Sequence, residues 1–351
     1  MVGTPYISFV VCSRNDTYAS DMLLRQQKSL DILSRQLAEY DVPVEFIMVE
    51  WNPPADTPRL SESLVWDGFP DNVSCRVITV APDPHACRVN GESSFDAVTA
   101  WNVGIRRARG TYILPKSADT IYSDAVINWI ATETLDLDCV YRCDRYDVEE
   151  TMLSIQGKDA VLASCEDLIS MHHARKPLPN GYAIRDLHTN GAGDFLLMER
   201  RYWKLIRGFE ESGSPVALDV DGLALHSAVT VGAKEVILPA NYKVFKPRHS
   251  STFINRVKLN LVNPWVLMDQ AIGFFRLPTK WQINLRIRFD YPRRRINGLR
   301  GVTFPSYARH FIAPARKMLT ESKLQNLNDA DWGLADAEVD IQTVRRADWD
   351  R

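Results

Sequence analysis

The sequence predicts an α/β fold with a mainly parallel sheet flanked by helices. Short apolar, β-branched runs recur along the chain, amphipathic segments lie between them, and polar side chains follow several of the runs. Strands that alternate with helices in this way are typical of a parallel sheet with crossover helices. The chain has 351 residues, of which 45% are hydrophobic and 25% charged, so it can bury a substantial core.

The first part of the chain alternates strands and helices. Residues 6–11 form an apolar strand, and leucines at helical spacing between 23 and 37 predict the first helix. Further strands are expected at 44–49, 75–80 and 111–114, the last of them preceded by a helix over 101–109. We expect Gly110 to end that helix, as glycine commonly does.

The second part continues the alternation less regularly. Residues 150–190 read as a mobile or acceptor-facing segment rich in polar residues. The other expected elements are a helix at 125–134, strands at 139–142, 195–198 and 236–238, a glycine-rich turn at 189–194, a short helix at 201–207 and a helix that begins near Ala217. The predicted domain spans 1–255, with its halves at about 1–123 and 124–255.

The composition changes after this domain. Residues 251–320 contain 13 Lys and Arg against 2 Asp and Glu, with aromatic residues between them. We expect 256–351 to be a mostly helical, basic and aromatic extension with an acidic tail, in which Trp332–Leu334 forms a docking turn. The basic region suits an anionic acceptor, an anionic membrane surface touched through 274–317, or RNA, and docking on the acidic remainder fits equally well.

Bulk properties narrow the function classes. The formal net charge of −2 argues against bulk electrostatic binding to nucleic acid. The six cysteines form no CxxC pair, so buried free thiols in a reducing cytoplasm are expected, with a metal site or a disulfide framework as the alternative. No signal-peptide pattern precedes the first strand, and no run of about 18 apolar residues occurs. A cytoplasmic or membrane-peripheral protein is the resulting expectation.

Polar side chains follow three of the predicted strands. Asp16, Glu50 and Asp119 would converge on one edge of a parallel sheet, where ligands bind in open α/β folds. Arginines at 106, 107 and 109 precede Asp119, which indicates a phosphate or metal–phosphate site. An ordinary helix–strand unit with a solvated basic face is the alternative. No GxGxxG or GxxxxGK[ST] motif occurs, so neither a dinucleotide fingerprint nor a P-loop is present.

Two further carboxylates, Asp219 and Asp221, open a predicted helix. The exposed amides of a first helical turn favour carboxylates, so capping explains one of the two. The second calls for another role, with a cap beside a solvated neighbour as the alternative.

These residues, in this order, resemble the GT-A glycosyltransferases of the family 2 type over roughly residues 5–255. The matching stretches are FVVCSRND at 9–16, EWNPP at 50–54, NVGIRRARG at 102–110, SAD at 117–119, GDFLLM at 193–198, RGF at 207–209, DVD at 219–221 and HSS at 249–251. The resemblance implies a Rossmann-like GT-A fold and a nucleotide-sugar donor.

The resemblance also implies roles for individual residues. The motif at 117–119 stands where such enzymes carry DxD, so Asp119 and His249 would bind Mn²⁺ or Mg²⁺, although Ser117 replaces the first aspartate. Alternatively, Lys116 and Arg106 would neutralise the leaving diphosphate without metal. The catalytic candidates on the acceptor side are Asp194, Asp219 and Asp221. The donor-binding candidates are Ser13, Arg14, Asn15, Asp16, Glu50, Asn102, Arg106, Lys116 and Ser117.

The resulting hypothesis is an inverting transfer of a sugar from a UDP- or GDP-sugar to an acceptor hydroxyl, in glycan or polysaccharide synthesis. A non-catalytic nucleotide-sugar or glycan-binding module on the same scaffold is the alternative from another class. A nucleotidyltransferase is less favoured because no GxGxR-type loop follows the first strand.

Overall fold

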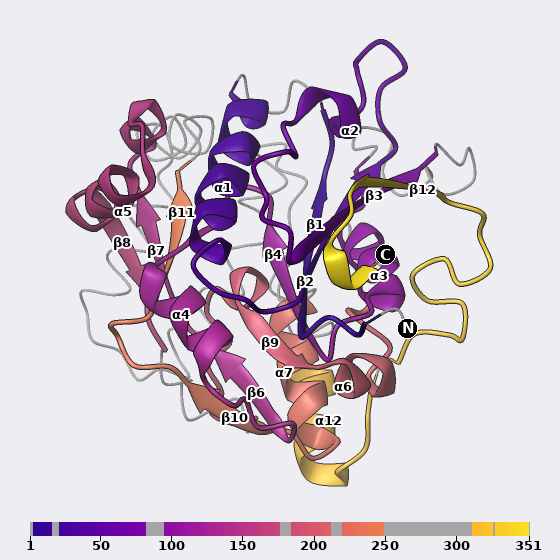
Figure 1. Cartoon of the computed structure of the whole chain (residues 1–351). Helices are drawn as coiled ribbons and strands as arrows, with labels where there is room; N and C mark the ends of the chain where they lie inside the picture. Colours follow the sequence, from indigo (N-terminus) through magenta and orange to yellow (C-terminus); the bar gives the residue numbers. More distant parts are fainter. Residues whose placement is uncertain are drawn as a thin grey trace, which may run out of the picture.

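An eight-stranded sheet forms the centre of the computed structural model (Figure 1). The structure describes residues 3–15, 21–81, 95–175, 184–211, 220–248, 311–325 and 327–350. The strand order is β10-β6-β9-β4-β1-β2-β3-β12. The strands are β1 (Ile7–Ser13), β2 (Val44–Trp51), β3 (Val73–Val80), β4 (Tyr112–Ser117), β6 (Cys139–Arg142), β9 (Leu196–Glu199), β10 (Lys234–Ile237) and β12 (Asp340–Arg345).

The sheet is mixed but mainly parallel. Strands β1 to β4 run parallel to one another, and β10 runs parallel to β6. Strand β9 is antiparallel to both of its neighbours, and β12 is antiparallel to β3. The fold class predicted from the alternation of strands and helices is therefore confirmed.

Helices cover both faces of the sheet because the strands are apolar on both sides. Phe9 and Phe46 face the side of α1 (Met22–Leu37) and α4 (Asp124–Thr132). Val10 faces the opposite side, against α3 (Ala97–Arg107), α6 (Arg200–Leu205) and α7 (Val220–Thr230). A strand that is buried on both faces has a continuous apolar run in the sequence, so the positions of these strands could be predicted.

A second, four-stranded sheet lies beside the first, in the order β5-β11-β7-β8. Its strands are β5 (Ile121–Tyr122), β7 (Asp144–Val148), β8 (Ile169–His173) and β11 (Lys243–Pro247). The 3₁₀ turn η2 (Glu150–Ser154) and α5 (Lys158–Asp167) pack on it through a separate apolar cluster. The expectation of an irregular segment from 150 onward is thus wrong for these described elements.

The carboxyl-terminal residues return to the main sheet. Helix α12 (Ala313–Glu321) packs on α7, and β12 extends the sheet beyond β3 (Figure 1). Trp332 is buried against the core on the α3 side, as a docking turn requires. The predicted domain boundary at 255 lies outside the described residues, as does most of the predicted membrane-contact region, so both stay predictions.

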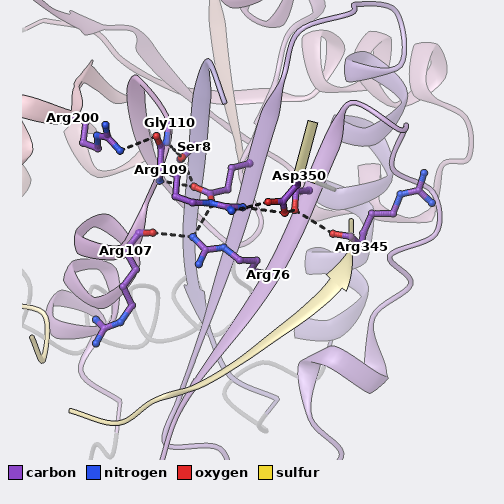
Figure 2. Close-up of polar contacts among 10 residues, drawn as sticks. Ser8, Arg76, Arg107, Arg109, Gly110, Arg200, Arg345 and Asp350 are labelled. Atoms are coloured by element: carbon purple, nitrogen blue, oxygen red, sulfur yellow. Dashed lines mark hydrogen bonds and ion pairs between the residues drawn. The ribbon is translucent and has the colours of Figure 1, made fainter. Parts of the chain in front are cut away.

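Gly110 has a different role from the one expected. Helix α3 ends at Arg107 with Ala108 as its cap, before the glycine is reached. Gly110 instead packs against β1, where its amide donates to the Ser8 hydroxyl at 2.9 Å (Figure 2). A Cβ at this position would come within 2.6 Å of the Ser8 amide nitrogen. Close backbone approach, and not helix capping, requires the glycine.

Five of the six cysteines lie in the described ranges, and all five are buried free thiols, as expected: Cys12, Cys75, Cys139, Cys143 and Cys165. Among the helices that the structure describes, none is long and apolar enough to cross a bilayer.

Candidate functional site

The carboxyl ends of the parallel strands meet at one edge of the main sheet, as predicted. In the strand register Ser13 lies opposite Glu50, and Ser117 lies opposite Cys12. Asp119 follows β4 directly at this edge. Asp16, the other residue expected here, lies outside the described residues. The convergence of strand ends is therefore confirmed for the described positions.

The arginines before Asp119 lie elsewhere. Helix α3 runs back along the sheet, so its last turn and the start of β4 lie at the amino edge, and β4 then rises about 3.3 Å per residue away from it. Arg106 donates to the carbonyls of Ala330 and Trp332, with its guanidinium 5.0 Å from the Trp332 ring centroid. Arg107 donates to Gly333 and Leu334. The predicted phosphate-side placement of these side chains is thus not what the structure has.

Arg109 belongs to a buried network at the same amino edge (Figure 2). Its Nε donates to the fully buried Glu45 carboxylate at 2.7 Å. Its Nη1 contacts Asp350 at 2.7 Å, and Arg76 donates to Glu45 as well. This network ties the carboxyl-terminal segment to the sheet and leaves the arginines no part in the ligand edge.

Asn102 is also engaged internally. Its side chain exchanges two hydrogen bonds with the backbone of Phe209, at 2.7 and 2.8 Å, and donates to Glu211. The side chain is fully buried, so it orders the segment after α6. The prediction from the resemblance that Asn102 and Arg106 bind the donor is therefore wrong for this structure.

Asp194 lies next to Ser117, at the end of the 3₁₀ turn η3 (Ala192–Asp194). Its Oδ1 accepts from the Ser117 hydroxyl at 2.6 Å and from the Thr120 hydroxyl at 2.8 Å, and its Oδ2 contacts Arg145 at 3.0 Å. Burial raises the pKa of this carboxyl, but Lys246, Arg145 and the two hydroxyls outweigh it and hold the pKa well below its usual range. Asp194 is therefore ionised and supplies a carboxylate beside the serine.

Lys246 on β11 completes this group, and the sequence did not single it out. Its ammonium forms an ion pair with Asp119 and lies 3.9 Å from the Asp194 carboxylate. Burial opposes its charge, but Asp119 and Asp194 outweigh that effect and raise its pKa. We call Ser117, Asp119, Arg145, Asp194 and Lys246 the corner cluster.

Lys116 points away from the corner cluster, toward α1. Its ammonium donates to the Ser29 hydroxyl at 2.9 Å and lies 5.8 Å from the Tyr122 ring centroid. Only 1% of the residue is exposed, and burial lowers its pKa to about 7 despite the attraction of Asp119. In this position Lys116 is a buried side chain of the core, without access to the sheet edge.

Asp221 in the first turn of α7 lies against η3. One of its carboxylate oxygens accepts from the Gly193 amide and the other from the Gly222 amide at 2.9 Å. Burial raises its pKa, against the opposing effects of these amides and of Arg142. Asp221 and Asp194 therefore flank the same turn, whereas Asp219 lies outside the described residues.

Residues at the end of β2 and just after β1 form the other side of the edge. Asn15 donates to the Pro58 carbonyl at 2.8 Å, and Glu50 accepts from the Leu60 amide at 2.9 Å. Glu50 is fully buried, and this burial raises its pKa. Arg14 lies over the Phe95 ring at 5.6 Å. Asn15 and Glu50 thus order residues 57–63 around the edge.

The described residues do not fit a divalent cation. They include no group of three or more His, Cys, Asp or Glu side chains that could hold a metal ion. Asp119 is paired with Lys246, and Asp194 with Arg145 and two hydroxyls. His249, the second predicted ligand, lies outside the described residues.

No protein family matches the sequence, and no curated protein does. Solved structures do match. The mannosyltransferase PcManGT from Pyrobaculum calidifontis, in complex with GDP-Man and Mn²⁺, is 12% identical with a TM-score of 0.42, covering 95% of this chain and 72% of its own. The S. aureus TarS structure spanning 1–349 is 14% identical with a TM-score of 0.40, covering 69% and 60%. The longer TarS structure matches with the same identity and score, and this chain covers 53% of its length.

Proposed function

We propose that this protein is a glycosyltransferase that moves a sugar from a nucleotide-diphosphate donor to an acceptor hydroxyl. The observation that carries the proposal is the corner cluster, which lies at the carboxyl edge of a parallel sheet beside the partly buried carboxylate of Asp221. Ligands of open α/β sheets bind at this edge. The resemblance stated above supports sugar transfer over other chemistry at such an edge.

The donor would lie along the edge from β2 toward β4. Its nucleoside is assigned to the side of Ser13, Arg14, Asn15 and Glu50, where Asn15 and Glu50 already fix the neighbouring loop. Its diphosphate would then face the corner cluster. A leaving diphosphate gains negative charge as the glycosidic bond breaks, and fixed cations stabilise that charge. Arg145 and Lys246 are the cations that the cluster offers.

Asp221 is the proposed general base. An attacking hydroxyl needs a base within hydrogen-bond reach, and a carboxylate works better near neutral pH when its pKa is raised. Burial raises the pKa of Asp221, and the Gly193 and Gly222 amides fix its orientation. Asp194 is then a positioning residue, because it holds η3 against Ser117. Direct displacement by this arrangement inverts the anomeric centre.

The finer features of the proposal come from the resemblance. The donor is a UDP- or GDP-sugar, the acceptor a glycan hydroxyl, and the setting polysaccharide synthesis in the cytoplasm or at an anionic membrane surface touched through 274–317. No nucleic-acid partner is proposed. The resemblance also implies Mn²⁺ or Mg²⁺, but the described residues do not fit such an ion, and the proposed transfer uses the cations of the chain instead.

A panel of UDP-, GDP- and CDP-sugars, scored for released nucleoside diphosphate with and without Mn²⁺, tests the proposal. We expect release with one donor class and a large loss in Asp221→Asn, because the base is removed. Asp167→Asn, an exposed position at the end of α5, is the matched control and should keep full turnover. Unchanged turnover in Asp221→Asn would show that another group is the base.

Thermal stabilisation by UDP, GDP and CDP separates the alternative. A non-catalytic nucleotide-binding module would be stabilised by one of these nucleotides, but it would release no nucleoside diphosphate from any nucleotide sugar. Absence of both stabilisation and release would contradict the transferase and the binding module alike.

A further inference from the structure

We propose that Lys246 is the built-in cation of this site, holding between Asp119 and Asp194 the charge that a divalent ion would otherwise supply. This inference rests on the proposed sugar transfer and adds that the transfer proceeds without metal. Lys246 is thereby assigned as a catalytic residue, since its ammonium would contact the leaving diphosphate.

The two carboxylates come from different parts of the chain. Asp119 follows β4, and Asp194 ends η3, where the Ser117 hydroxyl donates to it at 2.6 Å. Ser117 replaces the first aspartate expected of a DxD motif, and Asp194 places a carboxylate against that very serine. The cluster thus keeps two carboxylates, although the motif in the sequence has one.

The charges of the cluster match those of a metal site. Lys246 contacts Asp119 and lies 3.9 Å from Asp194, while Arg145 contacts Asp194 at 3.0 Å. Lys246 and Arg145 together carry the two formal positive charges that one divalent ion would bring to Asp119 and Asp194. Arg145 also pairs with Asp147 at 3.1 Å, and Asp147 in turn contacts His173, so Arg145 is shared between two carboxylates. Among the described residues, Lys246 forms its ion pairs with the cluster carboxylates Asp119 and Asp194.

The fold fixes the Lys246 ammonium in place. Strand β11 pairs with β7 in parallel register, with Lys246 opposite Asp147, and the neighbouring Phe245 and Pro247 are buried. The Lys246 side chain is only 18% exposed. A divalent ion on Asp119 would need to lie 2.0–2.6 Å from its ligating oxygen, and the Lys246 ammonium already contacts Oδ1 of that carboxylate. Repulsion between the two cations would disfavour that arrangement.

The proposed step balances without a further reagent. The acceptor oxygen forms a bond to the anomeric carbon as the bond from that carbon to the phosphate oxygen breaks. The acceptor proton goes to Asp221, and the electron pair of the broken bond stays on the nucleoside diphosphate. Lys246 and Arg145 face the charge that develops there.

Two measurements on the intact chain test the proposal. The first is nucleoside diphosphate release in EDTA, for the natural protein, Lys246→Ala and Lys246→Arg. The second is binding of Mn²⁺ alone, followed by electron paramagnetic resonance of the free ion, which needs no substrate. Lys243→Ala, on the same strand but paired with Glu166 outside the cluster, is the matched control.

We expect the natural protein to keep its turnover in EDTA and to take up no Mn²⁺. Lys246→Ala should lose about 100-fold in turnover, the scale of one lost electrostatic contact to a transition state. Lys246→Ala should also bind Mn²⁺ at the carboxylates that the lysine no longer contacts, and Mn²⁺ should restore its turnover. The double variant Lys246→Ala, Asp119→Asn should bind no Mn²⁺ there. Lys246→Arg should keep more turnover than Lys246→Ala, and Lys243→Ala should keep all of it.

Loss of turnover in EDTA that Mn²⁺ restores to the natural protein would overturn the proposal. Full turnover of Lys246→Ala in EDTA would overturn it as well. If the lysine variants fail to fold, the natural protein still decides through its EDTA response and its Mn²⁺ uptake. Absence of turnover with every donor, with or without Mn²⁺, would refute the sugar transfer itself. In that case the Mn²⁺ measurement still tests Lys246, because uptake of Mn²⁺ by the natural protein would show that the lysine does not take the place of a metal ion.

Discussion

Replacing Glu45 by glutamine tests the role of the arginines at the amino edge of the sheet. The Glu45 carboxylate is fully buried and accepts four hydrogen bonds. They come from the Ser8 hydroxyl at 2.6 Å, from Arg76 and the Arg109 guanidinium at 2.7 Å each, and from the Arg109 amide at 2.8 Å. Glutamine keeps the shape but removes the charge, and its NH₂ group cannot accept the hydrogen bonds that one of the two carboxylate oxygens now accepts.

The size of the effect follows from these contacts. Breaking a buried ion pair by removing one charge costs about 3–5 kcal/mol. Arg109 keeps its Asp350 partner, and 35% of its side chain is exposed, so water and Asp350 recover part of the loss. We therefore expect Glu45→Gln to lower the free energy of unfolding by about 3 kcal/mol, the low end of that range.

Urea unfolding followed by circular dichroism measures this change, and donor KM is measured beside it. Glu133→Gln is the control, because its side chain is exposed, and the change there should stay within about 0.5 kcal/mol. Turnover and KM of Glu45→Gln should match the natural protein below the unfolding transition. A decrease in the free energy of unfolding of less than about 1 kcal/mol, together with a raised donor KM, would refute the structural role. It would indicate instead that these arginines bind the diphosphate.

Three further predictions concern buried groups. Gly110→Ala should lower the unfolding free energy by about 1–3 kcal/mol in urea melts, because its Cβ would lie 2.6 Å from the Ser8 nitrogen, and a natural-like melt would contradict this. Asn102→Ala should cost about 1–3 kcal/mol by the same measurement and leave donor KM unchanged, since the buried side chain bonds Phe209 and Glu211; a KM effect without a stability loss would argue for donor binding. Burial lowers the pKa of Lys116 to about 7, so between pH 7 and 10.5 the unfolded chain binds more protons, and the stability should rise with pH by up to about 1.4 kcal/mol per unit. Lys116→Met should flatten that rise in urea melts at pH 7–9.5, and equal slopes would show that the folded protein keeps this lysine charged.

The main sheet could be predicted from the sequence because its strands are buried on both faces. Such strands are continuous apolar runs, and β1, β2 and β3 were expected within two residues of their observed starts. The second sheet escaped because β7 reads Asp-Arg-Tyr-Asp-Val, without an apolar run. Its stability comes from pairing with distant strands, which local patterns do not encode.

The sequence predicts part of the candidate site, and the rest depends on the pairing of distant strands. Ser117, Asp119, Asp194 and Asp221 were singled out, and the structure brings them to one region. Lys246 was missed because only the pairing of β11 with β7 places it there. The amino-edge position of Arg109 follows from the chain order alone, since residues that precede a parallel strand lie at the amino edge, opposite the residues that follow it.

Strand β12 gives the protein a long interval of exposure during synthesis. It is the partner of the β3 edge, yet Ser74 and Arg345, which contact each other in this pairing, are 271 residues apart. At about 5–20 residues per second, the ribosome needs roughly 15–50 s to make the chain between them. Throughout that time the free edge of β3 can pair with another nascent chain, which is the usual route from an open sheet edge to aggregation. The yield of folded protein should therefore depend on chaperones more strongly during synthesis, when many ribosomes translate one messenger RNA, than during refolding of the finished chain.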